Sequence, residues 1–108
     1  MITTLNALSE PNRLHIIELL RSGPHTVNQI VERLHLSQPL VSKHLHVLSQ
    51  AGLVKVQPSA QQRIYQIEAR PFEELDNWLE TYRHFWDKRL DSLDNYLQEL
   101  KDQEKPEP

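Results

Sequence analysis

The sequence predicts a mainly α-helical domain with a small β-hairpin and a long helix near its C-terminal end. Three observations support this fold class. Apolar residues recur at helical spacing in four segments of the first 51 residues. Two strand-like runs, LVKVQ and RIYQIE, flank a polar turn expected at Pro58–Gln61. Between Phe72 and Leu100, apolar residues then recur every three or four positions over about eight turns without Gly or Pro.

The first three helices are short and each has its own start or stop signal. Ile2, Leu5 and Leu8 indicate a first short helix. Ser9 is the expected cap of a second helix that ends near Gly23, with a core face of Leu14, Ile16, Ile17 and Leu20. Thr26 is the expected cap of a third, with a core face of Val27, Ile30, Val31 and Leu34.

The fourth helix lies in the segment LSQPLVSKHLHVLSQAGLV and carries the candidate functional surface. Ser37 is expected to begin this helix and Gly52 to end it. Val41, Leu45 and Leu48 share one face and are predicted to be buried. The outward-facing residues are polar or small, and no carboxylate occurs between Leu36 and Val54. We predict that this face contacts DNA through Ser37, Gln38, Pro39, Ser42, Lys43 and His46.

An ordinary solvated surface would explain such a face on an isolated helix. Here a helix and a short turn precede it and a hairpin follows, which is the order of a winged helix-turn-helix. The segments LSEPNRLHIIELL, LSQPLVSKHLHVLSQAGLV and RIYQI resemble the ArsR family of bacterial winged-helix repressors, over Leu5 to Ile67. The resemblance implies a homodimeric DNA-binding regulator. The residues Ser42 to Leu45 match the family's Ser-x-His-Leu element. Gln62 and Arg63 fall in its wing and are also expected to contact DNA.

The long last helix is predicted to hold the dimer together. It is similar to a metal-independent branch of the family, in which a long last helix ends a chain without sensor cysteines. We expect a DNA-binding domain at 1–70, a helix continuous with it at 71–101 and a disordered tail at 102–108. The predicted dimer interface consists of Leu5, Phe72, Leu75, Leu79, Tyr82, Trp86, Leu90, Leu93 and Leu97.

Charge is distributed unevenly, in a way that agrees with this division. Residues 1–70 carry seven basic and four acidic side chains, whereas residues 71–108 carry five basic and eleven acidic ones. The mildly basic front is therefore expected to meet double-stranded DNA, and the acidic back to face away from phosphates. A homodimer would place two copies of the DNA-contacting helix about one DNA turn apart, so the expected operator is a palindrome.

Other functions remain open as alternatives. A winged helix can bind a protein partner instead of DNA. The aromatic residues Trp78, Tyr82, Phe85 and Trp86 could line a pocket for a small-molecule effector. An enzyme is not expected, since the sequence has two Gly, no phosphate-binding loop and no Gly-x-Ser-x-Gly motif.

The amino-acid composition also bears on disulfides, metal sites and localisation. Without Cys there is no disulfide, thiolate metal site or thiol nucleophile. His44 and His46 point in different directions on a helix, and His84 has no second His on its face, so no metal or other cofactor is expected. The sequence has no signal-peptide pattern and no membrane-length apolar run, so we expect a cytoplasmic protein that does not bind membranes.

Overall fold

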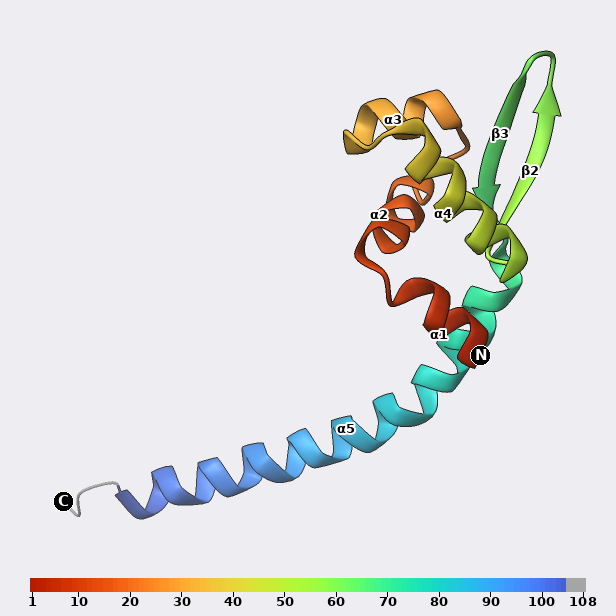
Figure 1. Cartoon of the computed structure of the whole chain (residues 1–108). Coiled ribbons are helices and arrows are strands. Elements are labelled where there is room, and N and C mark those ends of the chain that lie inside the picture. Colours follow the sequence, from red (N-terminus) through yellow and green to blue (C-terminus); the bar gives the residue numbers. More distant parts are fainter. Residues whose placement is uncertain (105–108) are drawn as a thin grey trace. The chain divides into compact units, whose positions relative to one another are not determined.

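The computed structural model describes residues 1–104, in two compact units that meet between Glu74 and Leu75. Five helices and a three-stranded sheet make up the described chain (Figure 1). In order, they are α1 (Ile2–Leu8), α2 (Pro11–Leu20), β1 (His25–Thr26), α3 (Val27–Leu34), α4 (Gln38–Gln50), β2 (Val54–Ser59), β3 (Gln62–Ile67) and α5 (Ala69–Glu104). This order confirms the predicted fold class, a winged helix-turn-helix with an N-terminal helix and a long C-terminal helix.

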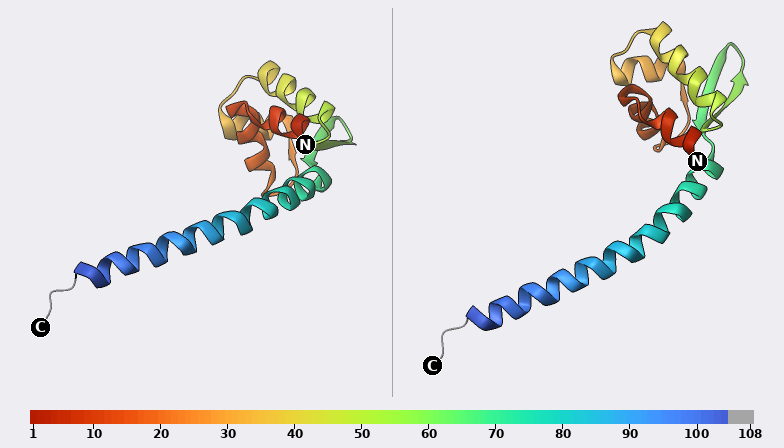
Figure 2. Two further views of the ribbon diagram at one scale, coloured as in Figure 1. Left: turned by 90° about the horizontal axis from the view of Figure 1, so that it is seen from below. Right: turned by 60° about the horizontal axis from the view of Figure 1, so that its bottom comes forward.

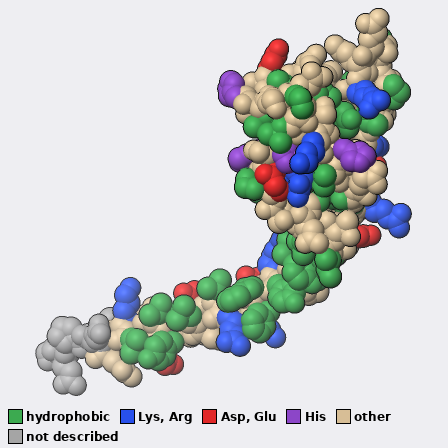
Figure 3. Space-filling model, in the orientation of Figure 1, with side chains coloured by type: hydrophobic (Ala, Val, Ile, Leu, Met, Phe, Trp, Pro, Cys, Tyr) green, Lys and Arg blue, Asp and Glu red, His purple; other side chains and the backbone are tan. Residues whose placement is uncertain are grey.

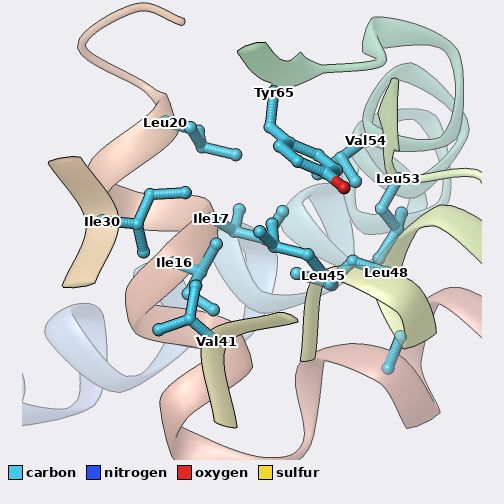
Figure 4. Close-up of a cluster of buried hydrophobic side chains, with 11 residues drawn as sticks. Ile16, Ile17, Leu20, Ile30, Val41, Leu45, Leu48, Leu53, Val54 and Tyr65 are labelled. Carbon is cyan, nitrogen blue, oxygen red and sulfur yellow. The ribbon is translucent and has the colours of Figure 1, made fainter. Parts of the chain in front are cut away.

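The core of the first unit joins helices α1 to α4 to the sheet. Figure 4 shows side chains from α2, α3, α4 and both hairpin strands converging on one apolar cluster. Ile16, Ile30, Val41, Leu45, Leu48 and Leu53 are fully enclosed there. Burial of a side chain of this size stabilises a fold by about 1.5–3 kcal/mol. The prediction for Leu14 was wrong, because Leu14 lies at the edge of the α2 stripe and is 40% exposed.

Side-chain caps mark the starts of α2, α3 and α4. Thr26 forms the expected cap of α3, and its backbone N–H in turn donates to Gln29 Oε1 at 2.9 Å. The predicted cap of α2 was off by one residue. Glu10 accepts the hydrogen bond from Arg13 N at 2.8 Å, whereas the Ser9 hydroxyl donates back to Asn6 O at the end of α1. A Glu side chain is long enough to reach this N–H group, and only the geometry of the turn shows that it does.

The sheet differs from the predicted hairpin in two respects. The strand order is β1-β3-β2, and β1 was not predicted because only His25 and Thr26 form it. The hairpin turn contains only Ala60 and Gln61, so the expected turn at Pro58–Gln61 was too long. Pro58 instead lies within β2, opposite Arg63. A proline is tolerated there because β2 is an edge strand with one side of its backbone unpaired.

Helix α5 is longer than expected at both ends. It begins at Ala69 rather than at residue 71, and it continues to Glu104. Asp102 to Glu104 were predicted to be disordered, and that prediction was wrong, since no Gly or Pro stops the helix before Pro106. The rest of the predicted tail, 105–108, lies outside the described residues. No helix among residues 1–104 combines the length and apolar character needed to cross a bilayer.

Gly52 links the end of α4 to the sheet, and its backbone conformation gives a testable consequence. Its φ of +77° lies in the left-handed region, and an added Cβ would meet no atom within 4 Å. We therefore expect Gly52→Ala to lower the free energy of unfolding by about 1–2 kcal/mol through backbone strain alone. Urea denaturation measures this loss.

Ala60 offers the matched control, because it already has a φ of +54° with a Cβ in place. Ala60→Gly should leave stability unchanged or raise it by up to about 1 kcal/mol, because relief of strain offsets the greater freedom of the unfolded chain. Equal stability of wild type and Gly52→Ala would contradict the assigned conformation at Gly52.

Candidate nucleic-acid interface

Packing of α4 against the core determines which of its residues face outward. Val41, Leu45 and Leu48 are buried, as predicted, and they fix the rotation of the helix about its axis. The opposite surface carries Gln38, Ser42, Lys43 and His46, all of which are exposed. The outer face of the helix therefore presents hydrogen-bond donors and acceptors and has no carboxylate.

The N-terminus of α4 is suited to bind a negatively charged group. Ser37 is the N-cap, and its Oγ accepts a hydrogen bond from Leu40 N at 3.4 Å. Pro39 lies in this first turn, where its missing N–H costs no helical hydrogen bond. The remaining N–H groups of a first turn have no partner within the helix and favour an anion such as a phosphate oxygen.

A concave surface that encloses a volume of about 660 Å³ lies between α4 and the hairpin. Figures 1 and 2 show the base of the β2–β3 hairpin next to the C-terminal end of α4. Five of the eight residues predicted to contact DNA line this surface together: Gln38, Ser42, His46, Gln62 and Arg63. Ser37, Pro39 and Lys43 are exposed but lie outside it.

The same surface contains polar residues that were not singled out from the sequence. These are Thr26, Asn28, Ser49 and Gln61. Thr26 and Asn28 come near the hairpin because β1 pairs with β3, with Thr26 opposite Ile64. A two-residue strand leaves no detectable pattern in a sequence, so this part of the surface could not be predicted. Ser49 could have been found, since it lies one helical turn beyond His46 on the same side of α4.

Charge at this surface is positive and sparse. No Asp or Glu lines it, and Arg63 is the one Lys or Arg that does. Neither Arg63 nor Lys43 forms an ion pair within residues 1–104. By contrast, Lys55 on β2 lies 3.9 Å from Glu68. The charges of Arg63 and Lys43 are thus not neutralised by a carboxylate of the described chain.

His44 is the exception on this helix, because it points inward while its neighbours point out. Its side chain is only 8% exposed, and its Nε2 lies 3.7 Å from Oε2 of Glu10. Neither ring nitrogen has a hydrogen-bond partner within the described chain. The carboxylate of Glu10 also caps α2, so one side chain contacts both α2 and α4. His44 therefore packs at the edge of the core.

The residues predicted to form a dimer interface fall into two groups. Phe72 packs against the core of the first unit, and Leu75 is partly buried. The others are exposed by 40–58% in the single chain: Leu5, Leu79, Tyr82, Trp86, Leu90, Leu93 and Leu97. Phe72 therefore contributes to intramolecular packing, whereas the exposed residues of α5 form an uncovered apolar stripe (Figure 3).

Within residues 1–104, no group of three or more His, Asp or Glu side chains is close enough to hold an ion. On α5, His84 Nε2 lies 3.8 Å from Glu80 of the same helix, an exposed i,i+4 pair. Such a pair is explained by helix geometry alone.

The fold and this surface define a bacterial regulatory protein of the winged helix-turn-helix class. The model of the arsR family of bacterial regulatory proteins matches residues 10–56, from the start of α2 into β2. The transcriptional repressor SdpR of Bacillus subtilis is 30% identical over 79 residues, which cover 73% of this chain and 88% of SdpR. The chain belongs to the ArsR family.

Solved structures agree with this assignment. An ArsR-family transcriptional regulator superposes with a TM-score of 0.69 at 27% identity, covering 79% of this chain and 93% of its own. HlyU from Vibrio cholerae superposes with a TM-score of 0.65 at 28% identity, covering 75% of this chain and 88% of its own. The family resemblance seen in the sequence is thereby confirmed, together with a role in transcription regulation.

Proposed function

We propose that this chain is a transcriptional repressor that binds a palindromic operator in double-stranded DNA as a homodimer. The observation that carries the proposal is the carboxylate-free surface formed by α4 and the hairpin. DNA repels carboxylates along its whole backbone, so a face free of them over a full helix fits a phosphate-lined groove. A protein partner would not impose this restriction, which favours DNA over the protein-binding alternative.

Helix α4 is proposed to enter the major groove with its N-terminal half. Gln38 can accept from and donate to the N6 and N7 edge of adenine. Lys43 can donate to guanine O6 and N7, or to a phosphate on the groove wall. Ser42 and His46 lie further along the same exposed face and extend the contact by one turn.

Phosphate contacts are proposed at two places around α4. The first is its N-terminus, where Ser37 and Pro39 lie and backbone N–H groups lack helical partners. The second is the hairpin, where Arg63 and Gln62 line the concave surface beside α4. A single unpaired cation on the hairpin implies few phosphate contacts there. Contacts to phosphates carry no sequence information, so the hairpin adds affinity that depends little on the DNA sequence.

Dimerisation is proposed because α5 exposes more apolar surface than a small monomer normally carries. Trp86 is 58% exposed, Leu90 54% and Leu93 50%, all on one helix. Such stripes mark interaction sites. A pocket for a small effector would instead enclose most of its ligand, and an exposed helical face does not. A homodimer would set two α4 helices about 34 Å apart, one DNA turn, which is why the operator should be palindromic.

Repression is supported by relatives. SdpR is described as a transcriptional repressor, and the Xylella fastidiosa relative as a biofilm growth-associated repressor. A dimer bound at a promoter blocks polymerase by occupying its site. On this proposal the protein works in the cytoplasm, where the DNA is, with itself and the operator as partners.

The α4 surface makes a direct prediction. Gln38→Ala and Lys43→Ala should each weaken operator binding by about 1–3 kcal/mol, because each removes a contact to a base edge. Gln50→Ala is the matched control, since Gln50 is exposed at the other end of α4 and does not line the concave surface. Selection of bound sequences from random duplex DNA first defines the operator, and fluorescence anisotropy then compares the variants. Unchanged affinity of both variants would sink this assignment.

The hairpin makes a second prediction. Arg63→Ala should weaken binding to operator and to random DNA alike and should reduce the slope of log K against log salt by about one. Lys55→Ala is the control on the same hairpin, because Lys55 already has Glu68 as a partner at 3.9 Å. A change of base preference at one operator position in Arg63→Ala would show that the hairpin reads sequence instead.

The α5 stripe makes a third prediction. Trp86→Asp should convert the dimer to a monomer at micromolar concentration, because it places an unpaired carboxylate in an apolar interface at a cost of several kcal/mol. Asn95→Asp adds the same charge to an exposed position of α5 outside the stripe and should stay dimeric. Sedimentation velocity distinguishes the two. A wild type that sediments as a monomer would rule out the homodimer.

A further inference from the structure

His46 is the one histidine of residues 1–104 that lines the concave surface between α4 and the hairpin. It is exposed there, between Ser42 and Ser49 on the same side of α4. We infer that His46 binds a phosphate of the operator as a protonated imidazolium, so that each protomer takes up one proton when it binds DNA. This inference rests on the proposed function and adds to it a dependence of operator affinity on pH.

No acidic group of the described chain competes with a phosphate for His46. The imidazole forms no ion pair within residues 1–104, and no Asp or Glu lines the concave surface. The titratable groups that share this surface are Arg63 and Tyr65, both from β3. The other lining side chains, from β1, α3, α4 and the hairpin, are amides, hydroxyls and two valines, none of which titrates near neutral pH. Lys43 lies one turn before His46 on α4, outside the surface. A positive charge on His46 therefore meets an anion only when DNA is bound.

The hydrogen-bonding chemistry of phosphate distinguishes the two forms of the imidazole. A neutral imidazole has one N–H donor and one nitrogen that accepts, whereas an imidazolium donates from both nitrogens. Phosphate oxygens only accept, and a hydrogen bond between two charged groups is roughly twice as strong as a neutral one. Arg63 is the one Lys or Arg that lines the concave surface, so a protonated His46 raises the number of cations there from one to two. On a surface with so few charges, this proton changes the affinity for DNA substantially.

The remaining histidines cannot supply the same effect, because none of them lines the concave surface: His15, His25, His35, His44 and His84. Of these, only His44 shares α4 with His46. It is buried on the opposite side, with its Nε2 3.7 Å from Oε2 of Glu10. A proton on His44 would act on the packing of α4 against α2, and so on the stability of the fold with or without DNA. A proton on His46 acts only on the complex.

Operator affinity of the full chain, measured by fluorescence anisotropy between about pH 6 and 8 at constant salt, tests the inference. Wild-type affinity should rise as the pH falls, because binding consumes a proton that becomes more available. The limit is roughly tenfold per pH unit for each proton taken up. His46→Gln retains hydrogen-bonding groups without a titratable one, and its affinity should change little over this range. His46→Arg carries a fixed charge and should also lose the pH dependence.

The salt dependence of binding gives a second measurement at the same site. At about pH 6, log K should fall more steeply with log salt for wild type than for His46→Gln, by about 0.9 per protomer, because one more phosphate is neutralised. At about pH 8 this difference should shrink, since fewer imidazoles carry a proton. Calorimetric titrations in two buffers of different ionisation enthalpy count the protons taken up directly.

His15→Gln and His84→Gln are the matched controls, since both remove an exposed histidine that lies off the concave surface, and both should keep the wild-type pH dependence. Thermal unfolding without DNA at the same pH values detects any effect that acts through the fold, such as one from His44. If His46→Gln binds the operator with the pH dependence of wild type, or if wild-type affinity does not change with pH, the inference is overturned and the proposed function stands. A wild type that binds no operator at any pH would overturn both.

Discussion

The rotation of α4 about its own axis is the constraint on which the functional surface depends. Burial of Val41, Leu45 and Leu48 against α2 and the sheet fixes that rotation. A turn of the helix by one residue would move the polar face by about 100° and bring it into the core. Burial of each of these side chains stabilises the fold by about 1.5–3 kcal/mol. The apolar face of α4, and not its polar face, therefore determines the rotation of the helix. The donors that face outward are therefore placed by residues that never contact a ligand.

The packing that orients α4 also buries one polar side chain, that of His44. The same packing that points Ser42 and His46 outward carries an imidazole into the interior, where its nitrogens lack hydrogen bonds within the described chain. Leaving a buried polar group unpaired costs about 1–3 kcal/mol. The Glu10 carboxylate at 3.7 Å reduces that cost, while the same oxygen caps α2. The start of α2 and helix α4 thus share one acidic side chain.

The sequence predicted what depends on periodicity and missed what depends on tertiary pairing. Helices α2 to α5 and the buried face of α4 follow from apolar spacing, which leaves a strong pattern over eight residues or more. Strand β1 leaves none, so Thr26 and Asn28 were missed at the concave surface. The cap at Glu10 and the two-residue turn at Ala60 depend on local backbone geometry that several residue types can adopt. Phe72 fits the α5 stripe by spacing, yet it packs against the core instead.

In the proposed homodimer, the exposed stripe of α5 would link self-association to DNA binding through the protein concentration. A chain that binds one half-site holds only half of the contacts that a palindrome offers. A second chain already attached through α5 meets the other half-site at an effective concentration near the millimolar range, so its binding becomes intramolecular. In such a dimer, the affinity of the α5 pair would set the protein concentration at which an operator fills. The α4 surface carries few charges, so a single copy would make few phosphate contacts, and linking two copies would compensate for this. On this proposal, the apolar stripe that lowers the solubility of a monomer is also the feature that lets a weakly charged α4 surface hold an operator.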